Sequence, residues 1–124
     1  MCFMARLMKD RKFREDQVTR LHEQHMAPIT KYVDELRAST GWLPYVAPLH
    51  GGVEARILSI LRDPGPATQD VTGSGVVCIE NDDQTAERQC ELMAAAGLTT
   101  HDITPWNAYP WYINRAPTNA QLRE

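Results

Sequence analysis

The first third of the chain shows a helical spacing of apolar residues. Between Lys12 and Ala38 they recur every three or four positions, which predicts an amphipathic helix. The positions concerned are Val18, Leu21, His25, Ile29, Tyr32 or Val33, and Leu36. Pro28 lies within this stretch and predicts either a kink or two abutting helices, because proline cannot donate a helical hydrogen bond. We expect Gly41 to end the helical part.

A near-continuous apolar run lies in the middle of the chain. Residues 55–66 read Ala-Arg-Ile-Leu-Ser-Ile-Leu-Arg-Asp-Pro-Gly-Pro, which predicts a parallel strand covered on both faces. Pro64 ends the strand and pushes Asp63 toward an extended conformation. Gly65 allows the backbone to come close to a ligand. The prediction is a carboxylate at the carboxyl end of a strand, where open α/β sheets bind their ligands.

The second half of the chain adds a helix and another strand. Asn81-Asp82-Asp83 offers N-caps for a helix from about Gln84 to Ala96, and the run from Thr100 to Trp106 predicts a strand. We expect this helix to bury Ala86, Cys90, Leu92 and Met93. Strand, helix and strand in this order predict the α/β class, with a parallel sheet flanked by helices. Asn107 follows the second strand and would then lie beside Asp63.

Length and composition are those of one soluble globular domain. The 124 residues are 43% hydrophobic and 23% charged, with a net charge of −3 that argues against indiscriminate binding of polyanions. We expect a single domain over residues 1–124, with a helical part at 1–41, a connector without regular structure at 42–54 and a βαβ part at 55–124. No apolar run approaches the roughly 20 residues of a membrane span, and the start of the chain does not resemble a signal peptide. We therefore expect a cytoplasmic protein with reduced cysteines and no contact with a membrane.

Asp63 and Asn107 are the candidate chemical groups. A carboxylate can orient and activate water, and a carboxamide offers both a donor and an acceptor, so it can bind one edge of a nucleobase. Asp-Pro-Gly is also a common turn, and an asparagine at a strand end can simply cap a loop. The pattern by itself leaves both interpretations open.

Three motifs, in the same order along the chain, resemble the uracil-DNA glycosylase superfamily. Leu61-Arg-Asp-Pro-Gly-Pro66 resembles the turn with which these enzymes activate water. The linking segment Gly73-Ser-Gly-Val-Val-Cys-Ile-Glu-Asn-Asp-Asp-Gln-Thr-Ala86 is similar to that of actinobacterial members, and Trp106-Asn-Ala-Tyr-Pro-Trp-Tyr-Ile-Asn-Arg-Ala-Pro-Thr118 resembles their asparagine segment. The likeness covers roughly residues 53–124. It implies a uracil-DNA glycosylase-like fold and hydrolysis of the N-glycosidic bond of uracil in DNA, as in base excision repair.

The resemblance also implies roles for individual residues. Asp63 would position the water that attacks the deoxyribose C1′. The backbone at Arg62, Pro64 and Gly65 would hold this water and the uracil O2. Asn107 would bind uracil at N3 and O4.

Cys78 receives a role from the same resemblance, because it falls near the place where relatives put an aromatic ring against uracil.

Aromatic residues crowd the segment around Asn107. One interpretation is a stacking surface for DNA bases at Trp111, with Arg115 in contact with phosphate. The alternative for the aromatic residues around Asn107 is a flap that packs on the core.

The chain also departs from the family. Leu61 replaces a glycine of the turn, and the sequence ends before the family's later His-Pro-Ser type loop. We therefore expect a fragment or a weak or inactive enzyme, with a non-catalytic nucleic-acid or nucleobase binding module as the alternative function. An uncovered strand edge would favour a homodimer or another partner.

Neither a cofactor nor a metal is expected. Three cysteines cannot supply the four ligands of an iron–sulfur cluster. His22 and His25 lack the i, i+4 spacing of the zinc-protease motif.

Overall fold

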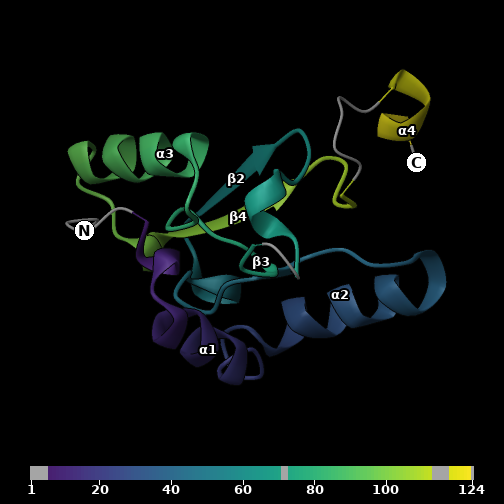
Figure 1. Cartoon of the computed structure of the whole chain (residues 1–124), viewed down its shortest axis with the longest axis horizontal. Helices are drawn as coiled ribbons and strands as arrows, with labels where there is room; N and C mark the ends of the chain where they lie inside the picture. Colours follow the sequence, from purple (N-terminus) through teal and green to yellow (C-terminus); the bar gives the residue numbers. More distant parts are fainter. Residues whose placement is uncertain (1–5, 71–72, 113–117, 124) are drawn as a thin grey trace.

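The structure is a computed structural model that describes residues 6–70, 73–112 and 118–123. Two helices come first along the chain, and short strands, a third helix, another strand and a short last helix follow (Figure 1). The elements are α1 (Arg11–Thr19), α2 (Ala27–Thr40), β1 (Tyr45–Val46), β2 (Ile57–Leu61), β3 (Val76–Val77), α3 (Gln84–Ala95), β4 (Ile103–Asn107) and α4 (Asn119–Arg123). The predicted mixed α/β class is confirmed.

The predicted break in the helical part is present. Pro28 lies in the first turn of α2, where a helix has no internal partner for the N–H that proline lacks. α1 and α2 are accordingly two separate helices. Of the two alternatives for the buried position, Val33 is fully buried and Tyr32 is exposed.

Two expected core residues are instead exposed. Val18 and Leu92 both lie mainly in solvent, so their predicted burial is wrong. α1 buries the polar Gln17 in place of Val18, and the Gln17 Oε1 accepts a hydrogen bond from the Leu49 N–H at 2.8 Å. This bond holds α1 on the connector.

The strands form two parallel pairs. β2 pairs with β4 in the register that sets Ile57 against Ile103 and Leu61 against Asn107. β1 pairs with β3, with Tyr45 against Val76. The expectation of parallel pairing therefore holds, but each sheet has two strands within the part of the chain that the structure describes. β1 also lies in the connector, for which no regular element was predicted.

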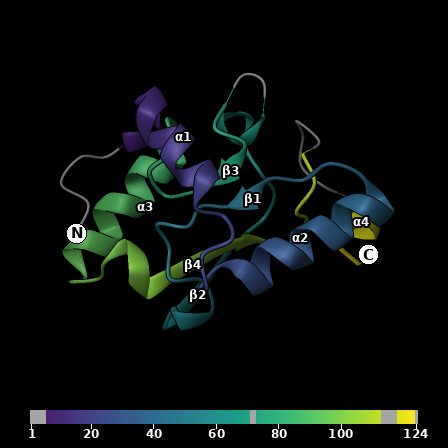
Figure 2. The ribbon, with the colours of Figure 1, turned by 90° about the horizontal axis from the view of Figure 1, so that it is seen from below.

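Alternate residues of β4 face helices on opposite sides of the β2–β4 pair. Ile103 packs in a core cluster with Ile79 and with Cys90 of α3. Thr104 and Trp106 line an apolar groove together with residues of α2. The views in Figures 1 and 2 accordingly show α3 and α2 on different sides of the pair.

The cysteines differ in state. Cys78 is a free, buried thiol in a second core cluster with Met8, Ala47 and Val76. Cys90 takes part in a disulfide, so the expectation of reduced thiols is wrong for this residue.

The connector packs closely because of an adjacent glycine pair. A Cβ on Gly51 would lie 1.9 Å from the backbone oxygen of His101, and one on Gly52 would lie 2.1 Å from that of His25. Gly52 also has a positive φ of 58°. Both positions thus require glycine, and they bring the connector against α2 and the start of β4.

His50 joins three segments from within this connector. Its Nδ1 donates to the Thr100 backbone oxygen at 3.0 Å, and its Nε2 accepts from the Ile79 N–H at 3.3 Å. These partners require the neutral imidazole with the proton on Nδ1. His50 is therefore a structural core residue.

β2 differs from its prediction. Leu58 and Ile60 are 60% and 59% exposed, and β4 is its only strand neighbour within the described residues. The expectation of a strand covered on both faces is wrong. Leu58 opens onto the apolar groove that Ile29, Tyr32 and Trp106 also line. The predicted homodimer or partner over this edge stays a prediction.

The structure contains no candidate for a transmembrane helix within residues 6–70, 73–112 and 118–123.

The buried His50 predicts a pH dependence of stability. Burial lowers the pKa of its imidazole from 6.5 to about 4. Between these values the unfolded chain binds a proton that the folded chain does not bind, so the free energy of unfolding falls as the pH drops from about 6.5 to about 4. The full loss is about 3 kcal/mol. Urea denaturation at a series of pH values measures it.

The matched control is His50→Gln, which retains hydrogen-bonding groups but cannot take up a proton. Carboxylates contribute equally to both proteins, so the difference in stability between wild type and variant isolates His50. We expect this difference to narrow as the pH falls from 6.5 to 4. A difference that is independent of pH would contradict the prediction.

The exposed strand predicts self-association. We expect the wild type to associate with increasing concentration and the double variant Leu58→Thr with Ile60→Thr to remain monomeric, because threonine keeps the preference for strand while removing apolar surface. Analytical ultracentrifugation measures both. Leu92→Thr is the control, since Leu92 is equally exposed but lies on α3. A monomeric wild type would refute the prediction of a homodimer, and the same loss of association in the control would refute the role of β2 in it.

Candidate functional site

The site begins where β2 and β4 end side by side. Leu61 and Asn107 are register partners. Beyond them the Ala108 N–H donates to the Leu61 oxygen at 2.7 Å and the Tyr109 N–H to the Arg62 oxygen at 2.9 Å. The backbone pairing therefore continues past both strands. It fixes the turn that carries Asp63 next to Asn107.

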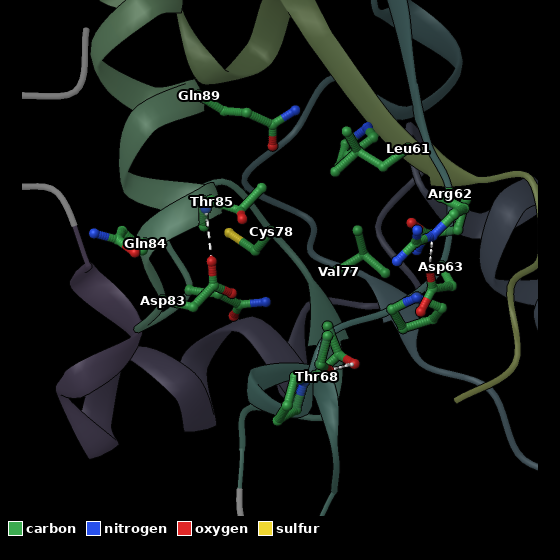
Figure 3. Close-up of a pocket in the computed structure, with 17 residues that line it drawn as sticks. Leu61, Arg62, Asp63, Thr68, Val77, Cys78, Asp83, Gln84, Thr85 and Gln89 are labelled. Carbon is green, nitrogen blue, oxygen red and sulfur yellow. Dashed lines mark hydrogen bonds and ion pairs between the residues drawn. The ribbon is translucent and has the colours of Figure 1, made fainter. Parts of the chain in front are cut away.

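A cavity of about 550 Å³ opens at this edge (Figure 3). Its walls come from the end of β2, the turn after it, β3, the first turns of α3 and the end of β4. The lining residues are Leu61, Arg62, Asp63, Pro64, Gly65, Pro66, Thr68, Val77, Cys78, Asn81, Asp83, Gln84, Thr85, Ala86, Gln89, Pro105 and Asn107. The volume is that of a small-molecule binding site. Six of the eight predicted site residues line it.

Asp63 is held at one side of the cavity. Its side chain is 12% exposed, and its Oδ1 accepts a hydrogen bond from Arg62 Nε at 2.6 Å. The chain then turns through a short 3-10 helix, where the Thr68 hydroxyl and N–H both donate to the Gly65 oxygen. The turn is thus fixed from its far end, and the carboxylate stays at the cavity.

Gly65 leaves open space beside the carboxylate. Its φ of −81° is accessible to any residue, so the backbone does not require glycine here. A Cβ added at this position would meet no atom within 4 Å. Its N–H donates no hydrogen bond within the part of the chain that the structure describes. The Gly65 N–H is therefore a backbone donor without a partner among the described residues, and a ligand has room to approach it.

Asn107 offers an amide without a partner. It is 3% exposed and lines the cavity, yet its carboxamide makes no hydrogen bond to any described residue. Among the described residues, the buried side-chain atoms that lack a hydrogen-bond partner are Arg6 Nε and Glu80 Oε1, so the Asn107 amide is instead open to the cavity. A ligand in the cavity can use both its donor and its acceptor.

Cys78 forms part of the apolar wall between β3 and α3. Burial is the main cause that raises the pKa of its thiol far above the usual range, and the Cys78 sulfur accepts from the Glu80 N–H at 3.3 Å. The thiol therefore stays protonated. Cys78 contributes shape to the cavity and no nucleophile.

Asn81 lines the cavity and fixes the segment around β3. Its Nδ2 donates to the Val76 oxygen at 2.9 Å and its Oδ1 accepts from the Ser74 hydroxyl at 2.7 Å. Asn81 is 2% exposed. The sequence predicted a helix cap among residues 81–83, and the cap is Asp83, whose side chain accepts from the Ala86 N–H at 2.7 Å.

α3 contributes a polar wall that sequence analysis missed. Thr85 and Gln89 lie one turn apart and line the cavity, and Figure 3 shows both on the side opposite Arg62 and Asp63. Gln89 Nε2 reaches the Ser59 hydroxyl of β2 at 3.5 Å. The available signal was the i, i+4 spacing of these polar residues beside the buried Ala86 and Cys90.

Trp111 is the one other predicted site residue that the structure describes, and it lies elsewhere. Trp111 does not line the cavity, and its Nε1 donates to the Thr40 hydroxyl at the end of α2 at 2.9 Å. Its ring also packs edge-on against Tyr109. Arg115 lies outside the described residues.

The described part of the site contains no histidine and no group of potential metal ligands. No histidine is among the residues that line the cavity. Within the described ranges, no three His, Cys, Asp or Glu side chains come together as metal ligands.

Substitution of the two buried asparagines is expected to change stability by different amounts. Asn81→Ala removes two hydrogen bonds and is expected to lower the free energy of unfolding by about 1–3 kcal/mol. Asn107→Ala removes none, so we expect a change within about 0.5 kcal/mol or a gain in stability. Chemical denaturation of both variants measures the contrast. An equal loss from Asn107→Ala would show that this residue has a structural role.

Comparisons of the chain with protein-family models, with curated proteins and with solved structures found no match to any of the three.

Proposed function

We propose that this protein has a uracil-DNA glycosylase-like fold and hydrolyses the N-glycosidic bond of uracil in DNA. One observation carries the proposal: Asp63 and Asn107, from two paired parallel strands, line the same cavity. Cys78 and the backbone at Arg62, Pro64 and Gly65 line it as well. The motifs that suggested this chemistry are far apart in the sequence and meet at one place.

The residues divide the reaction between them. The target nucleotide leaves the base stack and its uracil enters the cavity. Asn107 accepts from uracil N3–H and donates to O4, which satisfies its unpaired amide. The Gly65 N–H donates to O2. Cytosine has an acceptor at N3 and a donor at N4, so it mismatches this orientation of the amide.

Asp63 acts on the water. The bond between C1′ and uracil N1 breaks and its electron pair stays on N1, while the water oxygen forms a new bond to C1′. The carboxylate orients this water and takes up the proton that it loses. The uracil anion leaves with its charge spread over N1 and O2, where the Gly65 N–H donates, and it gains a proton from solvent. The products are free uracil and an abasic deoxyribose.

The catalytic role of Asp63 is tested by release of free uracil from a uracil-containing single-stranded oligonucleotide. We expect Asp63→Asn to lower the rate by about 10²- to 10⁴-fold, the usual range for loss of a general base. Glu35→Gln is the control, because Glu35 is an exposed acid of α2 outside the cavity and its loss should leave the rate unchanged. No release from wild type, or equal release from Asp63→Asn, removes the proposed activity.

A second candidate function is a nucleobase or nucleic-acid binding module without catalysis. The ion pair between Arg62 and Asp63 supports it, because this carboxylate already has a partner. The module predicts oligonucleotide binding that weakens with salt, without release of uracil. The same oligonucleotide therefore separates the two functions.

A further inference from the structure

The charges around the cavity are unequal. Asp63 and Asp83 are its two anionic residues, and Arg62 is the single cation among the described residues that line it. Asp83 is committed to its hydrogen bond with the Ala86 N–H of α3. A polyanion that delivers a base into this cavity therefore meets carboxylates on two sides and one guanidinium.

The Arg62 side chain is free to move although its backbone is fixed. Its backbone oxygen accepts from the Tyr109 N–H at 2.9 Å. The side chain is 63% exposed and is bound only through Nε, to Asp63 Oδ1, so both terminal amino groups have no partner among the described residues. In Figure 3 the guanidinium lies over Asp63 at the edge of the cavity.

This arrangement puts the two groups in competition. A carboxylate that is bound to a guanidinium is less available to bind and deprotonate water. Phosphate oxygens are strong partners for arginine, because the guanidinium can donate two parallel hydrogen bonds to them. The ion pair with Asp63 uses one of the N–H donors of Arg62, and the Arg62 side chain is exposed. Ion pairs with an exposed side chain contribute little to stability.

We propose that Arg62 binds a backbone phosphate beside the target nucleotide and passes from Asp63 to this phosphate when nucleic acid binds. The transfer releases the carboxylate for its water only when substrate is present. The inference rests on the proposed function. It adds Arg62 as a residue that couples binding of the phosphate backbone to the ability of the Asp63 carboxylate to bind water.

The first test measures binding alone. The probe is a single-stranded DNA oligonucleotide with one 2′-fluoro-2′-deoxyuridine, in which the glycosidic bond is resistant to cleavage. We expect Arg62→Ala to weaken binding about tenfold and to reduce the slope of log K against log salt by about 0.7, the loss of one phosphate contact. Arg62→Lys restores the slope. Lys31→Ala removes an exposed cation of α2 that does not line the cavity and leaves the slope unchanged.

The second test detects the competition with Asp63. Removing the carboxylate with Asp63→Asn frees Arg62, so it should tighten binding of the probe. If Arg62 exchanges partners, the gain from Asp63→Asn is larger in the wild-type background than in Arg62→Ala. Equal gains in both backgrounds would show general repulsion by the carboxylate and overturn the exchange.

The outcomes separate the two proposals. A protein that binds the probe but whose Arg62→Ala variant has an unchanged salt slope refutes the role of Arg62 and leaves the proposed function intact. If the wild type binds the probe and the effects of Asp63→Asn and Arg62→Ala on binding free energy are additive, the exchange of partners is refuted. A wild-type protein that does not bind the probe at all removes the proposed function, and this inference with it.

Discussion

The backbone register between β2 and β4 is the constraint on which the site depends. Parallel pairing brings two carboxyl ends to one edge, and the bonds from Ala108 and Tyr109 carry the alignment beyond the strands. Asn107 shares a face with Ile103 and Pro105, toward α3 and the cavity. A shift by one residue would turn it to the opposite face, toward the groove of α2. The position of one amide thus follows from five paired residues.

Much of the framework could be predicted because it depends on local chemistry. Pro28 breaks the helical part, Asp83 caps α3 and Pro64 ends the pairing of β2, and each effect acts within a few residues of its cause. The α/β class follows from the order of these elements. The proximity of Asp63 and Asn107 needed one further assumption, that the two strands are parallel neighbours, and the structure has them so.

The rest could not be predicted because it depends on which segments meet. Asn81 and Asn107 are of the same residue type and almost equally buried, but the Asn81 side chain makes two hydrogen bonds, whereas that of Asn107 makes none to the described residues. Nothing near either residue in the sequence distinguishes them. The apolar run of β2 predicted burial, yet burial depends on neighbours, and the described residues provide one strand neighbour. The burial of His50 could not be predicted either, because its hydrogen-bond partners Ile79 and Thr100 come from segments far along the chain.

The pairing of residues 57–61 with 103–107 also has a consequence for the time course of folding. The segment between the two strands must close into a loop before the first of their hydrogen bonds can form, and the entropy of closure is lost before any contact compensates for it. α1, α2 and α3 contain mainly local contacts and can form earlier. We therefore expect the cavity to form late in folding. A chain that stalls before this step would have native helices, but the ends of β2 and β4 would not yet lie side by side.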